Sequence, residues 1–187
     1  AGISLVLVRV DTSEPGLYGW GCATFTQRAR AVQVAVDEYL HPLLEGREPD
    51  RIEDIWHIAT NNAYWRNGPV LNNAVSGVDM ALWDIKAKRA GLPLYQLLGG
   101  KCREGAAVYV HAGGDTKEAV LESAQAFAEQ GFSHIRCQLG NYGGIGRDPK
   151  RPDGALDGAY FDPGVYTRTV TDLFAFLRER LDPGLEL

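Results

Sequence analysis

Cysteine, long apolar runs and clustered positive charge are all scarce in this sequence, and each scarcity excludes a class of protein. The 187 residues include only three cysteines, which are far apart and lack the CxxC spacing of a zinc site. An odd number of scattered cysteines also argues against a disulfide framework and favours a reducing compartment, so we expect a cytoplasmic protein. No apolar run reaches the roughly 18 residues of a membrane-spanning helix, and no basic start with an apolar middle marks a signal peptide.

Negative charge outweighs positive charge along the chain. There are 19 Lys and Arg residues against 24 Asp and Glu residues, a net charge of −5, and the basic residues form no cluster. Nucleic acids and anionic membranes are bound by such clusters, so we expect neither as a partner. Apolar residues make up 45% of the chain, which suits one packed domain or parts of two.

The first part of the sequence predicts a β-hairpin followed by helices. Residues 4–10 are rich in apolar β-formers, residues 11–19 are dense in turn formers, and residues 20–25 are typical of a return strand. The chain starts inside this pattern without an initiator Met, so we expect a further strand upstream. A helix is predicted over residues 28–44.

Two more helix signals follow. Asp50 and Glu53 predict a capping box, in which each side chain accepts from an unpaired backbone N–H at the start of a helix. The next helix ends at Gly91, and its polar face carries Asp84 and Lys88, an i,i+4 pair worth about 0.3–0.5 kcal/mol. Its apolar residues recur at spacings of three and four, which is typical of a helix with one buried face. That face comprises Leu71, Ala74, Val75, Val78, Ala81, Leu82 and Ile85.

The second part of the sequence alternates strands and helices. Strands are predicted over residues 106–114 and 132–140, with a helix between them that Asp115 or Thr116 begins. The loop over residues 140–164 is long enough to indicate a function rather than a mere connection. A second helix and the start of a third strand complete the pattern, which is typical of parallel βα units.

Polar side chains occupy one face of each of these two strands. His111 shares a face with Tyr109, and Arg136 shares a face with Gln138. Parallel strands are usually apolar on both faces, so a polar face on each of these strands is unusual and indicates a specific role. If the sheet closes into a barrel, they face its lumen near the C-terminal ends of the strands, where barrel active sites lie. The alternatives are a structural ion pair for Arg136 and a hydrogen-bonded core histidine for His111. The position of both residues at the same rim of the barrel favours a functional site.

Six segments of the sequence form a recognisable pattern: YGWGCATF, RIEDIW, AYWRNGPV, VSGVDMALWDIKAKRAGLPLYQLLGG, YVHAGG and IRCQLG. Together they resemble the mannonate-dehydratase-like branch of the enolase superfamily, of the mandelate racemase and muconate lactonizing enzyme type. The resemblance implies an α+β capping domain over residues 1–101. It also implies that residues 102–187 form the first units of an α/β (β/α) barrel, enolase-like and incomplete. The helix before Gly91 would be the central helix of the capping domain.

The resemblance also implies a chemistry. Such enzymes are magnesium-dependent lyases that remove the proton α to the carboxylate of a sugar acid, pass through an enediolate and then lose water. Arg136 matches an arginine that supports a tyrosine base, because a nearby cation lowers the pKa of a tyrosine. In mannonate dehydratases that tyrosine lies twelve positions later, where this chain has Asp148, so Tyr142 is our candidate for the base. His111, Gln138 and Thr26 are assigned to substrate binding, and Thr26 stands where those enzymes carry Asn.

No residue of this chain matches a metal ligand of the superfamily. The resemblance therefore implies that the magnesium ligands lie beyond Leu187, and that residues 1–187 alone are inactive and bind no magnesium tightly. The expected partners are a small sugar acid, the remainder of its own barrel and further copies in a homo-oligomer. Two alternatives stay open: a hydroxy-acid racemase or epimerase of the same superfamily, and a catalytically degenerate relative that regulates or binds. A Lys-x-Lys at the end of the second strand would favour the racemase, and IRCQLG has none.

Overall fold

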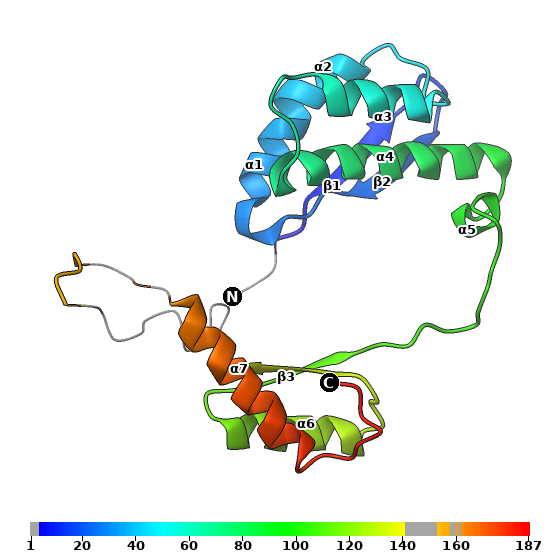
Figure 1. Ribbon diagram of the computed structural model, residues 1–187. Coiled ribbons are helices and arrows are strands. Elements are labelled where there is room, and N and C mark those ends of the chain that lie inside the picture. The colour runs from blue at the N-terminus through cyan, green and yellow to red at the C-terminus, as the bar shows by residue number, and fades with distance from the viewer. Residues whose placement is uncertain (1–3, 141–152, 158–159, 161) are drawn as a thin grey trace. The chain divides into compact units, whose positions relative to one another are not determined.

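The computed structural model describes residues 4–140, 153–157, 160 and 162–187 (Figure 1). The chain divides into two compact units, Ala1–Glu104 and Gly105–Leu187, and each is described by itself. The first unit packs a hairpin against helices, and the second packs helices against parallel strands. None of the helices in the described ranges has the length and apolar character needed to cross a membrane.

The first unit begins with the predicted hairpin. Its strands are β1 (Leu7–Asp11) and β2 (Tyr18–Cys22), which pair antiparallel with Val8 opposite Gly21. The strands are shorter than predicted, and β2 starts two residues earlier. The helical elements that follow are η1 (Thr26–Arg28), α1 (Ala29–Val34), η2 (Ala35–Leu40), α2 (His41–Leu44), α3 (Ile52–Asn61), α4 (Pro69–Ala90) and α5 (Leu94–Leu97).

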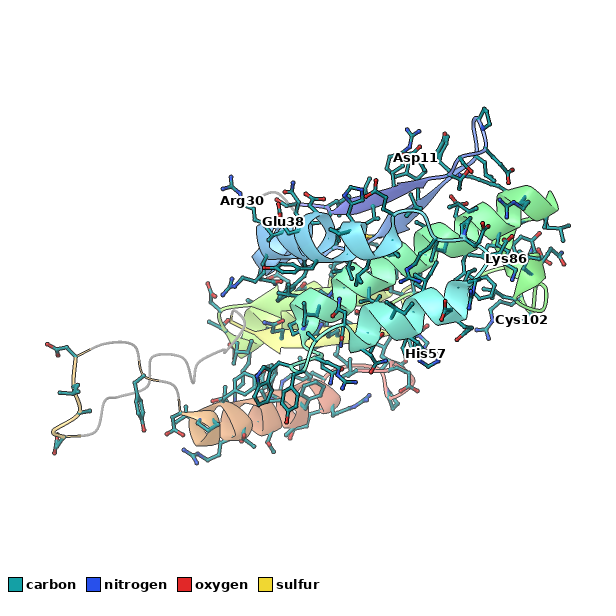
Figure 2. The ribbon with its side chains drawn as sticks, turned by 90° about the horizontal axis from the view of Figure 1, so that it is seen from above. Asp11, Arg30, Glu38, His57, Lys86 and Cys102 are labelled. Atoms are coloured by element: carbon teal, nitrogen blue, oxygen red, sulfur yellow. The ribbon has the colours of Figure 1, made fainter. Side chains whose placement is uncertain are left out.

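The helix predicted over residues 28–44 is interrupted in the structure. It begins as a 3₁₀ turn, and residues 35–40 form a π-helix, in which the N–H of His41 donates to the carbonyl of Val36 five residues back. Pro42 has no N–H to continue the regular i→i−4 ladder, which accounts for the irregular turn before it. Exposed side chains such as Arg30 and Glu38 project from this helical run, as Figure 2 shows.

The predicted capping box is wrong. α3 begins at Ile52 without a side-chain cap, because the carboxylate of Asp50 accepts from Arg89 of α4 instead. Arg89 also pairs with Glu14 of the hairpin turn. A charged guanidinium on a neighbouring element is the stronger partner for Asp50 than a backbone N–H on its own helix.

α4 is the central helix of the first unit, as the resemblance implied. Its buried face packs against β2, and Gly91 ends it in the left-handed conformation with φ of 65°. Two predicted members of this face are not fully buried: Leu71, of which 43% is exposed, and Val75, which is half-buried. The buried residues are Ala74, Gly77, Val78, Ala81, Leu82, Ile85 and Ala87.

Two glycines let β2 lie directly on α4. A Cβ atom at Gly21 would come within 1.8 Å of the carbonyl oxygen of Gly77, and one at Gly19 within 1.9 Å of that of Ala81. Backbone therefore packs on backbone here, a close approach that only glycine allows. Gly77 has the same role on the helix side, because its Cβ would lie 2.6 Å from the Cβ of Ala23.

Asp84 and Lys88 do more than form a solvent-exposed pair. The carboxylate of Asp84 accepts from the N–H of Trp20 at 2.9 Å and from Lys88 at 2.8 Å. Lys88 also donates to the carbonyl of Tyr18 at 2.8 Å. The pair therefore connects α4 to β2. Burial acts to raise the pKa of Asp84, but the hydrogen bonds from Lys88 and Trp20 outweigh it and hold that pKa below its usual range.

Asp84→Asn is expected to lower the free energy of unfolding by about 1 kcal/mol at pH 7, because it removes the charge that accepts both bonds. The folded-state pKa of Asp84 is depressed, so this stabilisation is present above the unfolded value near 3.8 and is lost as pH falls through the folded value. Urea titrations of the wild type and of Asp84→Asn between pH 7 and pH 3 measure this effect. The difference between their free energies of unfolding should become smaller below about pH 4. Asp37→Asn, at an exposed position, is the control. If the difference in free energy of unfolding between the wild type and Asp84→Asn stayed the same down to pH 3, the ionised carboxylate of Asp84 would not be the source of the stabilisation.

The second unit has the predicted order of strand, helix, strand and helix. The elements are β3 (Val110–Gly114), α6 (Lys117–Glu129), β4 (Ile135–Leu139) and α7 (Pro163–Arg178). β3 and β4 pair in parallel, and the side chain of Thr116 caps α6. The start of a third strand is also present, because Glu186 forms a parallel bridge with His134. The predictions about residues 141–152, in the long loop, fall outside the described residues.

β3 differs from its prediction in where it starts. It begins at Val110 rather than at residue 106, because the ladder can extend only as far as its neighbour, and β4 begins at Ile135 after the turn that ends α6. Consequently His111 and Arg136 are each the second residue of their strand. The expectation that they lie at the C-terminal ends of the strands is therefore wrong.

Candidate functional site

The sheet of the second unit has one covered face and one polar face. Ile135, Cys137 and Leu139 of β4 are buried against α6 and α7, where they form a core with residues such as Val120 and Leu173. Side chains alternate along a strand, so the residues between them point to the opposite face. This confirms the predicted alternation in β4.

His111 and Arg136 lie directly opposite each other on the polar face. They are register partners in the parallel ladder, and both side chains are exposed. The ring of Tyr109 stacks on the imidazole of His111, with 5.2 Å between centroids and 22° between planes. Within the described ranges no carboxylate pairs with Arg136, so the alternative of a structural ion pair has no partner there.

Gln138 completes the polar face. It is half-buried, faces the same way as Arg136 and donates weakly to the carbonyl of Gly140 at 3.4 Å. Its register partner is Gly113, where an added Cβ would meet nothing closer than 3.8 Å. The sheet surface beside Gln138 is therefore open on the β3 side. A cation, an imidazole and an amide on an open surface can bind a carboxylate and hydroxyl groups.

The thiol of Cys137 is not available to this face. It is buried on the helix side, and burial raises its pKa, although the charge of Arg178 acts in the opposite direction. A protonated thiol on the covered side is inert as a nucleophile or metal ligand. The reactive groups of the sheet are therefore those on its polar face.

The other predicted site residues are placed as follows. Thr26 is exposed and is the first residue of η1 in the first unit, so it does not belong to the sheet. Tyr142 lies outside the described residues. No three side chains of His, Cys, Asp or Glu converge within the described part of the chain in a way that could hold a metal ion.

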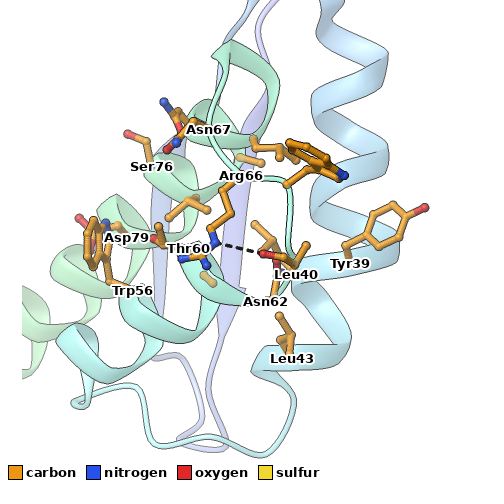
Figure 3. Close-up of a pocket in the computed structure, with 18 residues that line it drawn as sticks. Tyr39, Leu40, Leu43, Trp56, Thr60, Asn62, Arg66, Asn67, Ser76 and Asp79 are labelled. Atoms are coloured by element: carbon orange, nitrogen blue, oxygen red, sulfur yellow. Dashed lines mark hydrogen bonds between the residues drawn. The ribbon is translucent and has the colours of Figure 1, made fainter.

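The first unit also contains a hollow that the sequence did not predict. It has a volume of about 760 Å³ and lies between η2, α3, α4 and the loop of residues 62–68 (Figure 3). Trp56, Trp65 and Arg66 are among the residues that line it, together with Asp79 of α4. Burial and the charge of Glu53 both raise the pKa of Asp79.

A family model matches the first unit. The N-terminal domain of the mandelate racemase / muconate lactonizing enzyme family matches residues 2–99, which is slightly more than half of the chain. This range contains the hairpin, α4 and the hollow.

Curated relatives and a solved structure match the chain over almost its whole length. The D-galactonate dehydratase family member RspA of Pantoea ananatis (strain LMG 20103) is 55% identical over 203 residues, covering 100% of this chain and 49% of the relative. A D-galactonate dehydratase family member of Enterocloster bolteae is also 55% identical, with 100% of this chain and 46% of the relative covered. A crystal structure of an enolase from Pantoea ananatis with bound D-gluconate and magnesium superposes with a TM-score of 0.86 at 54% identity, covering 99% of this chain and 49% of that one. The chain thus spans about half the length of the curated relatives it matches.

Proposed function

Because this chain belongs to the mandelate racemase / muconate lactonizing enzyme family, within the enolase superfamily, we propose that the complete protein is a magnesium-dependent acid-sugar dehydratase. The first unit is the capping domain, and the second contains the first strands and helices of the barrel. The observation that carries the proposal is the pairing of His111 with Arg136 on the polar face of the parallel sheet. The dehydratase names of the relatives and the D-gluconate of the Pantoea structure support the same chemistry.

The proposed reaction begins with removal of the proton α to the substrate carboxylate. The positive charge of an arginine side chain lowers the pKa of a tyrosine hydroxyl beside it, and we propose this role for Arg136. We assign the base to Tyr142, six positions after Arg136. The proton moves from the α carbon to the tyrosine oxygen, which leaves an enediolate. Collapse of the enediolate forms the double bond to the next carbon and breaks the bond from that carbon to its hydroxyl. The departing hydroxyl must take a proton from a general acid to leave as water, and no residue of this chain is assigned to that role.

Substrate binding is assigned to His111, Gln138 and Thr26. The imidazole and the amide can each donate and accept, which suits the hydroxyl groups of a sugar acid. The stacked ring of Tyr109 restricts the imidazole of His111, so its nitrogens keep a fixed direction. Thr26 contributes a hydroxyl from the first unit.

Magnesium adds positive charge next to the carboxylate when it is bound, which favours loss of the α proton. The described residues do not provide its site, since no three suitable ligands converge among them. We propose that the magnesium ligands belong to residues outside this chain. Every role assigned above therefore concerns binding or proton transfer by the chain's own side chains.

The proposed substrate is a sugar acid other than D-mannonate. Two positions support this: Asp148 occupies the position of the mannonate-dehydratase tyrosine, and Thr26 replaces an Asn. The hydroxyl of Thr26 is shorter than an amide and can both donate and accept one bond, so it favours a different arrangement of hydroxyl groups.

The full-length protein is expected to convert at least one sugar acid to a 2-keto-3-deoxy acid in the presence of magnesium. The panel should include D-gluconate, D-galactonate and D-mannonate, with the keto product measured by its semicarbazone absorbance. Chelation of magnesium should abolish the product. Exchange of the α proton with solvent deuterium, without loss of water, would instead support a racemase or epimerase. Binding of the acids without exchange or product would support a degenerate relative.

A further inference from the structure

We propose that Thr24 is a positioning residue, which holds Thr26 at the place where its hydroxyl can bind a substrate. The inference deepens the proposed function, because it rests on the assignment of Thr26 to substrate binding. It is carried by the hydrogen bonds of Thr24 at the point where the chain leaves β2 and enters η1.

The ladder of the hairpin ends beside Thr24 in an incomplete pair. Val6 and Ala23 follow the last regular pair of β1 and β2, which is Leu7 with Cys22. The N–H of Ala23 donates to the carbonyl of Val6 at 2.9 Å. In a regular antiparallel ladder the N–H of Val6 would donate back to the carbonyl of Ala23. It donates instead to the hydroxyl oxygen of Thr24 at 3.0 Å.

The side chain of Thr24 thus replaces a backbone carbonyl in the ladder. Because the carbonyl of Ala23 is not held by the neighbouring strand, the chain can leave the sheet here without an unpaired backbone N–H. Phe25 follows with an extended backbone, and its carbonyl accepts from the N–H of Arg28 at 2.9 Å to close η1. Thr26 is the first residue of η1. The bond to Thr24 therefore fixes the direction in which the chain enters η1, and with it the position of Thr26.

The neighbours of Thr24 are anchored, whereas the side chain of Thr26 points to no described partner. Ala23 is fully buried, and Phe25 packs against the core of the first unit. The sulfur of Cys22 also lies 3.1 Å from the hydroxyl oxygen of Thr24. Thr26 is exposed, and none of the described residues forms a hydrogen bond with its hydroxyl. A hydroxyl on a fixed backbone suits ligand binding, since little conformational entropy is lost when the ligand binds.

The test replaces Thr24 in the full-length protein. Thr24→Val keeps the shape of the side chain but removes the acceptor of the Val6 N–H. It is expected to raise KM for the sugar acid about fivefold and to leave kcat nearly unchanged, because a binding contact is weakened and no proton transfer is. Thr24→Ser keeps the hydroxyl and should retain the wild-type KM. Hydrogen exchange over residues 25–28, measured by mass spectrometry without substrate, should be faster in Thr24→Val than in the wild type.

Thr12→Val is the matched control. The hydroxyl of Thr12 donates to the carbonyl of Leu17 at 2.8 Å and accepts from the N–H of Glu14 at 3.2 Å, in the turn at the other end of the hairpin. This variant loses comparable hydrogen bonds of the same hairpin. It should therefore change neither KM nor the hydrogen exchange over residues 25–28.

Thr26→Val completes a double-mutant cycle. If Thr24 acts through Thr26, Thr24→Val should raise KM by less than about twofold when it is introduced into Thr26→Val. A KM that Thr26→Val itself leaves unchanged would remove Thr26 from the proposed function. Faster exchange in Thr24→Val would in that case still show that Thr24 holds the segment in place.

Three results would overturn the positioning role. Unchanged exchange over residues 25–28 in Thr24→Val would show that its hydroxyl does not hold this segment. An equal rise in KM for Thr12→Val would show that any loosening of the hairpin has the same effect. A full rise in KM for Thr24→Val in the Thr26→Val background would show that Thr24 acts independently of Thr26.

Discussion

Gly21→Ala is expected to lower the free energy of unfolding of the first unit by about 3 kcal/mol, at the upper end of the range for overpacked sites. The new methyl group would lie 1.8 Å from the carbonyl oxygen of Gly77 and 2.8 Å from its carbonyl carbon. Both are backbone atoms of α4, so no side chain can rotate away to make room. The hairpin must instead move off the helix, which opens the core on both sides of the contact.

Chemical denaturation followed by the fluorescence of Trp20 on the same strand measures this loss. Gly105→Ala is the matched control, because an added Cβ there meets nothing within 4 Å and its backbone is not left-handed. The control should change stability by only a few tenths of a kcal/mol. An unfolding midpoint for Gly21→Ala equal to that of the control would mean that β2 does not lie on α4 as described.

If the proposed function holds, Arg136→Gln is expected to lower kcat/KM of the full-length protein for the proposed sugar-acid substrate by roughly a hundredfold or more. The substitution keeps the length of the side chain approximately but removes the charge that we propose supports the tyrosine base. Loss of a nearby cation raises the pKa of a tyrosine, so the pH at which kcat rises should also move upward. Arg136→Lys retains the positive charge but lacks the forked donors of a guanidinium. Its kcat/KM should therefore lie between that of the wild type and that of Arg136→Gln.

A pH–rate profile distinguishes this role from a structural one. A variant that is merely misfolded loses activity at every pH, whereas loss of the cation shifts the rising limb of the profile. Arg103→Gln, at an exposed position, provides the control and should keep the wild-type profile. Equal kcat/KM in Arg136→Gln and wild type would remove Arg136 from the catalytic site.

Features that depend on local pattern could be predicted from the sequence. The apolar spacing of α4 identified most of its buried face, although Leu71 near the start of the helix is exposed and Val75 is half-buried. The alternation along β4 likewise placed Cys137 on the covered side and Arg136 on the polar side. Both patterns follow from the period of a single element, so no knowledge of its neighbours is needed.

Features that depend on a distant partner could not be predicted. Asp50 has the right spacing from Glu53 for a capping box, but its carboxylate accepts a hydrogen bond from Arg89, 39 residues later. The sequence pattern predicts a start for β3 that is too early, because the first residue of β3 depends on where its neighbour β4 begins. The segment that contains Trp65 has no local pattern that indicates a hollow, because the hollow forms only where η2, α3 and α4 pack together.

The contact of β2 with α4 also has a consequence for how the first unit folds as it is synthesised. The bond from Trp20 to Asp84 joins residues 64 positions apart, so the hairpin cannot acquire its core until α4 has left the ribosome. Until then β1 and β2 form an isolated two-stranded ribbon, which is marginally stable at best in water. Loop closure over such distances slows folding, and unpaired strand edges exposed meanwhile are prone to associate with other chains. Chaperone dependence of the nascent chain should therefore end only when α4 has emerged.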